Sequence, residues 1–495
     1  MSQLPKGWVE TKLGSYLHLK NGFAFKSADY QEPSDSTVPV IRISDINGAY
    51  SSDEKANHVP KEKAAHGFEI SEGDLLVAMS GATTGKIGVY KGETPAYQNQ
   101  RVGNIRLNVP HIGNVKFRNH LVKYLSPTIL KVAYGGAQPN ISASGIESID
   151  INLPPLAEQT RIVEKLDEVL AQVDTIKARL DGIPAILKRF RQSVLAAAVS
   201  GKLTEEWRKN NSGQQIKPLL YEIETQREKL KAAKLLKRSF GKHETVDPQS
   251  NELPDGWEWV CFDQISDNEN NALKAGPFGS ALKKSDCTDH GYRVYGQEQV
   301  IAGDETLVSY YINEEKYQQL EACSVKSGDI LISLVGTIGK VLILSDKVES
   351  GIINPRLVKL SLNSEIQRKY IKAYLDSPLA WHFFNGFSHG GTMDILNLGI
   401  LRKLPIPLPP VEEQKEIVRL VDQYFAFADT IEAQVKKAQA RVDKLTQSIL
   451  AKAFRGELVP QDPNDEPADK LLERIALARK EAEVLAKAAK KAAKK

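Results

Sequence analysis

The sequence predicts an α+β protein in which two mixed α/β domains are separated by two long helices. These helices are expected to form an antiparallel coiled coil, and the chain carries an internal pseudo-two-fold repeat. Residues 153–159 (LPPLAEQ) return as residues 408–414 (LPPVEEQ), and the offset of 408 − 153 = 255 holds for about fifty residues. Residues 4–8 (LPKGW) return as residues 253–257 (LPDGW). A repeat this long predicts a two-fold pseudosymmetric molecule.

Both copies of the repeat contain apolar residues at alternating spacings of four and three, which is the a/d seam of a coiled coil. The first seam consists of Ile162, Leu166, Val169, Val173, Ile176, Leu180, Ile183, Leu187, Phe190 and Val194. The second consists of Ile417, Val421, Tyr424, Ala428, Ile431, Val435, Ala438, Val442, Leu445 and Ile449. Each helix is expected to end near a glycine, Gly201 or Gly456. Pro184 should kink the first helix. The alternative is two core helices of two ordinary domains.

The repeat divides the chain into six predicted segments. These are a first domain (1–152), a first coiled-coil helix (153–208), a helical spacer and linker (209–252), a second domain (253–407), a second coiled-coil helix (408–458) and a C-terminal helix with a basic tail (459–495). β-Branched runs predict strands at 38–43, 74–78 and 329–333, and helical patches are expected at 115–125 and 365–375. The predicted strands and helices follow the same order in the two domains, whereas the loop residues differ. This indicates two related modules that recognise different targets.

Composition narrows the class of protein. Of the 495 residues 41% are hydrophobic, which is enough for sizeable cores, and no apolar run approaches the ~20 residues of a membrane span. The three cysteines are scattered and odd in number, which favours a reducing, cytoplasmic location. The net charge of +4 is unevenly distributed. Residues 209–243 contain nine Lys or Arg and three Glu (+6), and residues 479–495 contain seven Lys or Arg and two Glu (+5). The rest of the chain therefore carries 4 − 11 = −7. Binding to nucleic acid would therefore depend on local basic patches.

Glycine-rich loops are the strongest candidates for a binding surface. Residues 80–86 (SGATTGK) are not a Walker A motif, because three residues separate the glycines and Ile87 replaces the required Ser or Thr. They are either a hairpin turn or a loop whose lysine and threonines touch DNA, and residues 335–340 (VGTIGK) are the counterpart. Residues 20–26 (KNGFAFK) and 274–280 (KAGPFGS) are either phosphate-contacting loops or tight turns held by a buried Phe.

Polar residues in and near these loops have the chemistry of DNA contacts, since Asn and Gln read adenine, Arg reads guanine and Lys binds phosphate. The candidates are Lys20, Asn21, Lys26, Arg42, Thr83, Thr84, Lys86, Gln98, Asn99, Gln100, Arg101, Gln138, Asn140, Lys274, Ser280, Lys283, Lys284, Gln297, Gln299, Thr337, Lys340, Asn354, Arg356 and Thr392.

Catalytic motifs were not found in the sequence. The nine histidines are scattered, with no HExxH and no triad-like grouping, and no glycine-rich fingerprint for S-adenosylmethionine is present. Pro154-Pro155 and Pro409-Pro410 follow leucine, whereas adenine methyltransferases place Asn or Asp before their Pro-Pro-aromatic motif. The chain is therefore expected to have no catalytic residues and to bind no metal or cofactor itself, which argues against a self-sufficient methyltransferase.

The Pro-Pro-x-x-Glu-Gln motif leading a heptad helix, present twice, resembles the specificity subunit of type I restriction–modification systems. The helix ends at 187–192 (LKRFRQ) and 447–458 (QSILAKAFRGEL) are similar to the enteric type IA branch. The resemblance implies two target recognition domains that each read one half of a bipartite, asymmetric DNA site. It also implies that the helices set the spacing and dock two modification subunits.

Partners and cofactors follow from the same resemblance. The modification subunits would methylate adenine N6 with S-adenosylmethionine after flipping the base out of the duplex. Two restriction subunits would supply translocation and cleavage driven by ATP, with Mg²⁺. A coiled-coil scaffold with two protein-binding domains remains the alternative.

Overall fold

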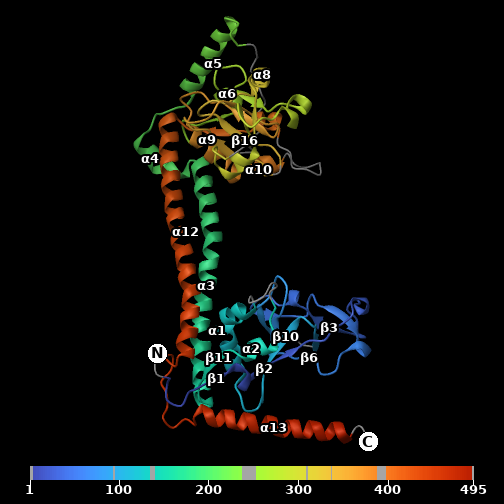
Figure 1. Cartoon of the computed structure of the whole chain (residues 1–495). Helices are drawn as coiled ribbons and strands as arrows, with labels where there is room; N and C mark the ends of the chain where they lie inside the picture. Colours follow the sequence, from blue (N-terminus) through green and yellow to red (C-terminus); the bar gives the residue numbers. More distant parts are fainter. Residues whose placement is uncertain are drawn as a thin grey trace. The chain divides into compact units, whose positions relative to one another are not determined.

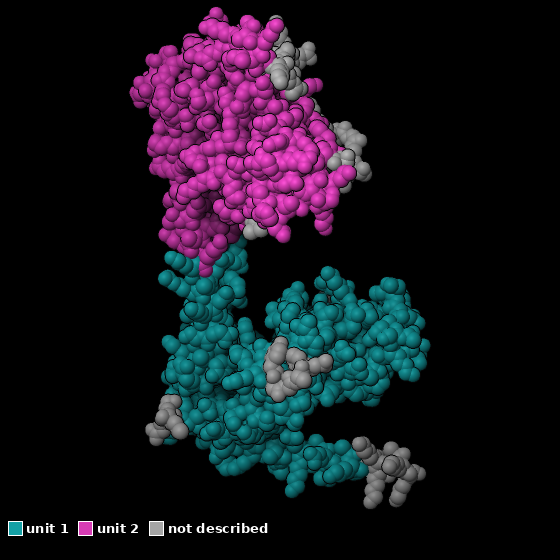
Figure 2. Space-filling view, turned by 45° about the horizontal axis from the view of Figure 1, so that its top comes forward, with its two compact units in different colours: residues 1–181, 437–495 teal, residues 182–436 magenta. Residues whose placement is uncertain are grey.

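The structure is a computed structural model, and it describes residues 4–92, 95–133, 140–236, 252–307, 310–335, 337–386 and 397–492. Two long helices carry the repeat: α3 (Leu156–Val199) and α12 (Val411–Phe454), each of 44 residues. Both begin directly after Pro-Pro, since proline fixes a φ that suits the first helical turn. The helix α3 continues through Pro184. The chain divides into two compact units, residues 1–181 with 437–495 and residues 182–436 (Figure 2).

The two helices run antiparallel, as predicted. Within the first unit, Lys177 Nζ lies 2.9 Å from Asp443 Oδ1. Within the second unit, Arg191 Nη2 lies 2.7 Å from Asp429 Oδ1 and 3.1 Å from Glu432 Oε2. Residue numbers therefore rise along α3 as those of the facing residues on α12 fall, which is the antiparallel arrangement (Figure 1).

Burial along the predicted seam varies from position to position. Buried positions are Ile162, Leu166, Val173, Leu187, Val194, Ile417, Val421, Ala428, Val435 and Ile449. Partly buried positions are Val169, Leu180, Ile431 and Val442. Ile176, Tyr424 and Leu445 are 45%, 39% and 46% exposed. Buried and exposed seam positions therefore alternate along both helices, and Ala428 and Val435 in the central part of α12 are buried.

The first unit contains a module of two main sheets. Strands β2-β10-β7-β8-β4 form one sheet and β5-β3-β9-β6 the other, while β1 pairs with β11. The strands are β1 (Val9–Lys12), β2 (Leu17–Asn21), β3 (Thr37–Ile41), β4 (Tyr50–Ser51), β5 (Asn57–Pro60), β6 (Glu69–Ile70), β7 (Leu75–Ala78), β8 (Ile87–Tyr90), β9 (Ala96–Gln98), β10 (Val102–Leu107) and β11 (Asp150–Leu153). The helices are α1 (Val115–Ala133), α2 (Ala143–Glu147) and the C-terminal α13 (Ala468–Ala492).

The second unit repeats this topology in shorter form. Its sheets are β13-β19-β16-β17, β15-β14-β18 and β12-β20. The strands are β12 (Glu258–Val260), β13 (Leu273–Ala275), β14 (Tyr292–Tyr295), β15 (Tyr311–Ile312), β16 (Ile330–Ser333), β17 (Val341–Ile343), β18 (Gly351–Ile353), β19 (Leu357–Leu360) and β20 (Ile406–Leu408). The helices are α4 (Glu205–Asn210), α5 (Lys217–Ala232), α6 (Phe262–Ile265), α7 (Gln297–Ala302), α8 (Glu314–Gln319), α9 (Arg368–Leu375), α10 (Pro378–Gly386) and α11 (Leu398–Lys403). The predicted α+β fold with a pseudo-two-fold repeat is confirmed.

The two repeated motifs, LPxGW and PPxxEQ, contact each other in both units. Trp8 Nε1 donates to Glu158 Oε2 at 3.0 Å, and Trp257 Nε1 donates to Glu413 Oε2 at 2.8 Å. All four side chains are buried. A buried carboxylate needs such a donor, so the Glu of the second motif is fixed by the Trp of the first. This contact attaches each module to the start of the helix that follows it.

Each module also packs against the end of the other module's helix. A Cβ added to Gly456, just beyond α12, would lie 2.5 Å from Pro5 Cγ, and one added to Gly201, just beyond α3, would lie 2.5 Å from Pro254 Cγ. Both glycines have positive φ (+76° and +74°), a conformation that ends helices and favours glycine. The sequence prediction of helix ends near these glycines is therefore explained by close packing as well as by backbone conformation.

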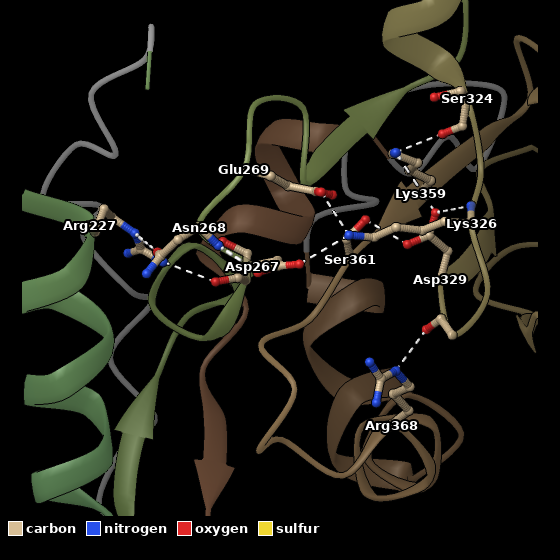
Figure 3. A network of polar contacts seen from close by, with 12 residues as sticks. Arg227, Asp267, Asn268, Glu269, Ser324, Lys326, Asp329, Lys359, Ser361 and Arg368 are labelled. Atoms are coloured by element: carbon tan, nitrogen blue, oxygen red, sulfur yellow. Dashed lines mark hydrogen bonds and ion pairs between the residues drawn. The ribbon is translucent and has the colours of Figure 1, made fainter. Parts of the chain in front are cut away.

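A polar network holds the second module's scaffold together (Figure 3). Asp329, buried before β16, accepts a hydrogen bond from Ser361 Oγ at 2.6 Å and lies 3.8 Å from Lys359 Nζ. Arg368 Nε, at the start of α9, donates to the Gly328 carbonyl at 3.0 Å. Arg227, buried on the spacer helix α5, donates to Asn268 Oδ1 at 2.8 Å. These bonds hold α5, β16, β19 and α9 in one body.

The first module repeats the centre of this network with different partners. Asp74 accepts from Asn104 Nδ2 at 2.9 Å and from Arg106 Nη2 at 3.2 Å. Arg118 Nη2, on α1, donates to the Gly73 carbonyl at 2.8 Å. The Gly-Asp pair that recurs in the sequence is therefore a scaffold element, with the Asp74 carboxylate bonded to β10, the strand beside β7.

Candidate nucleic-acid interface

Three loops of the first module meet at one place, which we call the first loop cluster: residues 20–26, 78–86 and 98–102. The Met79 amide donates to the Arg101 carbonyl at 2.9 Å, and the Val102 amide donates to the Asn99 carbonyl at 2.8 Å. The Phe23 amide donates to the Gln98 carbonyl at 2.9 Å. These backbone bonds join the glycine-rich hairpin, the Asn-Gln-Arg turn and the KNGFAFK loop into one surface.

The second module has an equivalent arrangement, the second loop cluster: residues 274–279, 333–335 with 337–340, and 354–357. The Leu334 amide donates to the Arg356 carbonyl at 2.9 Å, and the Leu357 amide donates to the Asn354 carbonyl at 3.2 Å. The Gly276 amide donates to the Leu357 carbonyl at 2.9 Å. The same three loops therefore meet in both modules: the hairpin-to-turn bond and the bond within the turn are equivalent, whereas the third bond joins different positions of the loop.

Residues 80–86 form the predicted hairpin turn between β7 and β8, which pair antiparallel. The Gly85 amide donates to the Ala78 carbonyl at 2.8 Å, and Thr84 Oγ1 donates to the Gly81 carbonyl at 2.6 Å. Gly81 and Gly85 have φ of +85° and +83°, which only glycine adopts readily. Thr83 Oγ1 donates to Ile43 O at 3.4 Å. The turn is built within the chain and leaves the Lys86 side chain exposed.

Exposed cations and amides remain on both loop clusters. In each Asn-x-Arg turn the Asn Oδ1 accepts from the Arg backbone amide, at 3.3 Å for Asn99 and 2.9 Å for Asn354. The Arg side chains project outward. The candidates with exposed side chains are Asn21, Lys26, Lys86, Gln100, Arg101, Asn140, Lys283, Lys284, Thr337, Lys340 and Arg356. Asn99 and Lys274 are partly buried.

Several other candidates have their polar groups bonded inside the protein. Gln98 Nε2 donates to the Lys20 carbonyl at 2.8 Å, and Gln299 Nε2 donates to the Leu307 carbonyl at 3.1 Å. Gln297 Nε2 donates to the Val335 carbonyl. All three Gln side chains are buried. Their amides hold loops in place and are turned away from the surface on which a DNA base edge would be read.

Two candidate cations are also engaged locally, and three candidates lie outside what the structure describes. Lys20 Nζ donates to the Gly67 carbonyl and lies 5.2 Å from the centre of the Phe68 ring. Arg42 Nε lies 3.6 Å from Asp45 Oδ2. Gln138 and Thr392 are not among the described residues, and neither is the side chain of Ser280.

A cavity of about 660 Å³ lies beside the first hairpin, a feature that sequence reasoning missed. Lys86, Lys116, His120, Lys123 and Asp167 contribute to its lining. Asp167 accepts from Lys116 Nζ at 2.8 Å and lies 3.0 Å from His120 Nε2. Burial lowers the pKa of His120 below its ordinary value. Among the residues that the structure describes, no cluster of His, Cys, Asp or Glu could hold a metal ion.

Comparison with known proteins identifies the family. The profile of the type I restriction modification DNA specificity domain matches residues 5–185 and 257–439. The chain belongs to this family. It is 34% identical to the type I restriction enzyme EcoBI specificity subunit of Escherichia coli, over 99% of this chain and 94% of the relative. It is 30% identical to the EcoKI specificity subunit of Escherichia coli strain K12, over 100% and 99%. The resemblance inferred from the sequence is thus confirmed, and the scaffold alternative is not favoured.

Solved structures of the family share the fold. The HsdS subunit of Thermoanaerobacter tengcongensis aligns with a TM-score of 0.51 at 19% identity, covering 92% of this chain and 98% of that subunit. A chain from a structural study of complex assembly in the type I restriction–modification system aligns with a TM-score of 0.56 at 18% identity, covering 92% and 100%. No helix of the described part of the chain is long and apolar enough to cross a membrane.

Proposed function

We propose that this member of the specificity family is the non-catalytic, DNA-reading subunit of a type I restriction–modification complex, and that each module reads one half of a bipartite, asymmetric site. The observation that carries the proposal is the pair of loop clusters. Backbone bonds hold an Asn-x-Arg turn, a glycine-rich hairpin and a lysine-flanked loop together in both modules, and the bond between the hairpin and the turn is equivalent in the two. Exposed Arg101 and Arg356 have the fork geometry that reads guanine, while Lys86 and Lys340 suit phosphate.

The divergence between the clusters supports two different half-sites. Gln100 in the first turn is replaced by Pro355 in the second, so one turn carries an amide that can read adenine and the other does not. Scaffold residues such as Asp74 and Asp329 recur, whereas exposed loop residues change. Two modules that share a scaffold and differ in their exposed side chains are expected to recognise two different half-sites, which together form an asymmetric site.

The long helices supply the spacing and the docking surface for two modification subunits. Exposed apolar residues lie along α3 and α12, among them Ile176, Ile186, Phe427 and Leu445. Apolar side chains on charged helices are typical of protein interfaces. S-adenosylmethionine, ATP and Mg²⁺ belong to the modification and restriction subunits in this proposal, and double-stranded DNA is the shared partner.

A domain exchange tests the proposal. Residues 1–152 are replaced by the equivalent region of a relative, the chimera is expressed with its modification subunits, and the methylated motif is read by methylation-aware sequencing. One half of the motif should change and the other half should stay. The reciprocal exchange of residues 253–407 is the matched control and should change only the other half. A motif in which both halves change together in either chimera would contradict independent reading.

A second test concerns catalysis. The purified chain incubated with DNA and S-adenosylmethionine should transfer no methyl groups until a modification subunit is added, and mass measurement of the assembled complex should give two modification subunits per chain. Methyl transfer by the chain alone would contradict the proposal.

A further inference from the structure

Two exposed phenylalanines occupy equivalent loops of the two modules. Phe278 is 80% exposed, the highest value among the large hydrophobic side chains of the described residues, and Phe23 is 41% exposed. The loops correspond at their glycines, Gly22 and Gly276, with an offset of 276 − 22 = 254, so Phe278 lies one position further along its loop than Phe23 does. A single exposed apolar side chain is ordinary on a protein surface. Two on corresponding loops of diverged modules, one and two residues after the shared glycine, indicate a shared use.

The loops that carry these rings are held rigidly. A Cβ added to Gly22 would lie 2.0 Å from the Asn99 carbonyl oxygen, and one added to Gly276 would lie 1.9 Å from the Asn354 carbonyl oxygen. No side chain fits at either place, so each loop backbone lies directly on an Asn-x-Arg turn. In the first loop the phenylalanine that packs into the core is Phe25, which is buried. The exposed Phe is therefore not needed to hold the turn.

The surroundings of the rings favour DNA over protein as the occupant. Exposed Lys26 follows Phe23, and exposed Lys283 and Lys284 follow Phe278. Each loop is bonded to the turn that carries Arg101 or Arg356. Lysine is depleted at protein–protein interfaces and abundant where phosphates are bound. Aromatic rings among such cations are suited to stacking on bases.

We propose that Phe23 and Phe278 are apolar wedges that stack against bases and unstack one base step in the half-site that each module reads. The inference rests on the proposed function and adds a DNA-distorting role to it, since an inserted apolar side chain partly unstacks the step that it enters. The Phe23 ring rests on Phe25 and Phe68, with ring centres 5.1 and 5.5 Å away. The less covered Phe278 is expected to insert more deeply and to cause the larger change.

The test uses the complete complex of this chain with its modification subunits and a duplex that contains the motif found by methylation-aware sequencing. 2-Aminopurine, whose fluorescence rises when it is unstacked, is placed in turn at positions within and beside each half-site. Phe278→Ala should remove the rise at one step of the second half-site, leave the first half-site unchanged and lower affinity roughly tenfold or more. Phe278→Leu, which keeps an apolar side chain, should retain part of both effects.

Tyr221→Ala is the matched control, because Tyr221 is an aromatic residue of the same unit that is 76% exposed on α5. It should bind and unstack DNA like the unchanged chain. If Phe278→Ala also behaves like the unchanged chain, the wedge is refuted while DNA recognition stands. If Phe278→Ala fails to assemble with the modification subunits in the absence of DNA, the ring contacts protein and the wedge is again refuted. A wild-type complex that binds no DNA would instead refute the proposed function.

Discussion

Lengthening both long helices by one heptad should widen the gap in the DNA target. Asp181 Oδ1 on α3 accepts a hydrogen bond from Gln439 Nε2 on α12 at 2.7 Å, so these two residues face each other. Seven residues inserted after Asp181 and seven inserted before Gln439 therefore lengthen the pair at one level. An insertion of seven keeps the a/d register of both seams, because the heptad is the repeat of the coiled coil.

The size of the effect follows from helix geometry. Seven residues at ~1.5 Å each add ~10 Å to the pair. At ~3.4 Å per base pair, this equals about three base pairs. The unspecified gap in the methylated motif should grow by about three pairs, while the specific block on each side keeps its sequence. Three pairs also turn the DNA by ~100°, so methylation is expected to be slower than with the unchanged chain.

Methylation-aware sequencing of cells that express the lengthened chain with its modification subunits reads the gap directly. An insertion of four residues in α3 alone is the control, since it shifts the seam out of register and should reduce assembly. A heptad variant that keeps full activity on the original gap, and has none on a longer gap, would refute the idea that these helices set the spacing.

Further predictions concern single residues. Arg101→Ala should weaken the free energy of DNA binding by ~1–3 kcal/mol and relax the preference for one base. Lys86→Ala should instead weaken binding to all sequences and reduce the slope of log K against log salt concentration by about 1. Identical binding isotherms for the two variants would contradict these roles. Burial raises the pKa of Glu158 above the ordinary glutamate value of 4.5. The stability that protonated Glu158 contributes is therefore fully present below pH 4.5 and is lost as the pH rises through the pKa of the folded state. Glu158→Gln should therefore gain stability relative to the unchanged chain between pH 4 and 7 in urea unfolding, and a pH-independent difference would contradict this. Gly182 lies in the interior of α3, and no atom beyond the neighbouring helix backbone lies within 4 Å of a Cβ added there. Gly182→Ala should therefore raise the free energy of unfolding by ~0.5–1 kcal/mol in the same urea assay. A lower free energy of unfolding would contradict this.

Local periodicity made the helices and much of the scaffold predictable. The four-and-three spacing locates α3 and α12, because residues at this spacing lie on one face of a helix. The strand predicted at 329–333 is observed as β16, Ile330–Ser333. The contact between Trp8 and Glu158 was not predicted, although both motifs were recognised as repeats. Its partners are 150 residues apart, and neither motif contains a local signal for the other.

The loop candidates show a different limit of sequence reasoning. Gln98 and Arg101 are three residues apart in one polar run, yet the first is buried and the second is exposed. Strand alternation and the turn at Asn99 decide which side chain faces the core. Composition alone therefore grouped these residues as candidates and could not separate their structural amides from the exposed side chains. Phe278 was overlooked as a contact residue because a phenylalanine is ordinarily expected to be buried.

The packing of Gly456 on Pro5 has a consequence for synthesis on the ribosome. The first unit is completed by residues 437–495, whereas the second unit is continuous from 182 to 436. At ~5–20 residues per second, the 255 intervening residues take roughly 13–50 s to translate. During that time Phe117 and Tyr124 lack their partner Phe454, whose ring centre finally lies 5.5 and 4.9 Å from theirs. The later-made unit can therefore finish folding first, and the nascent N-terminal module is a natural client for chaperones until the C-terminus emerges.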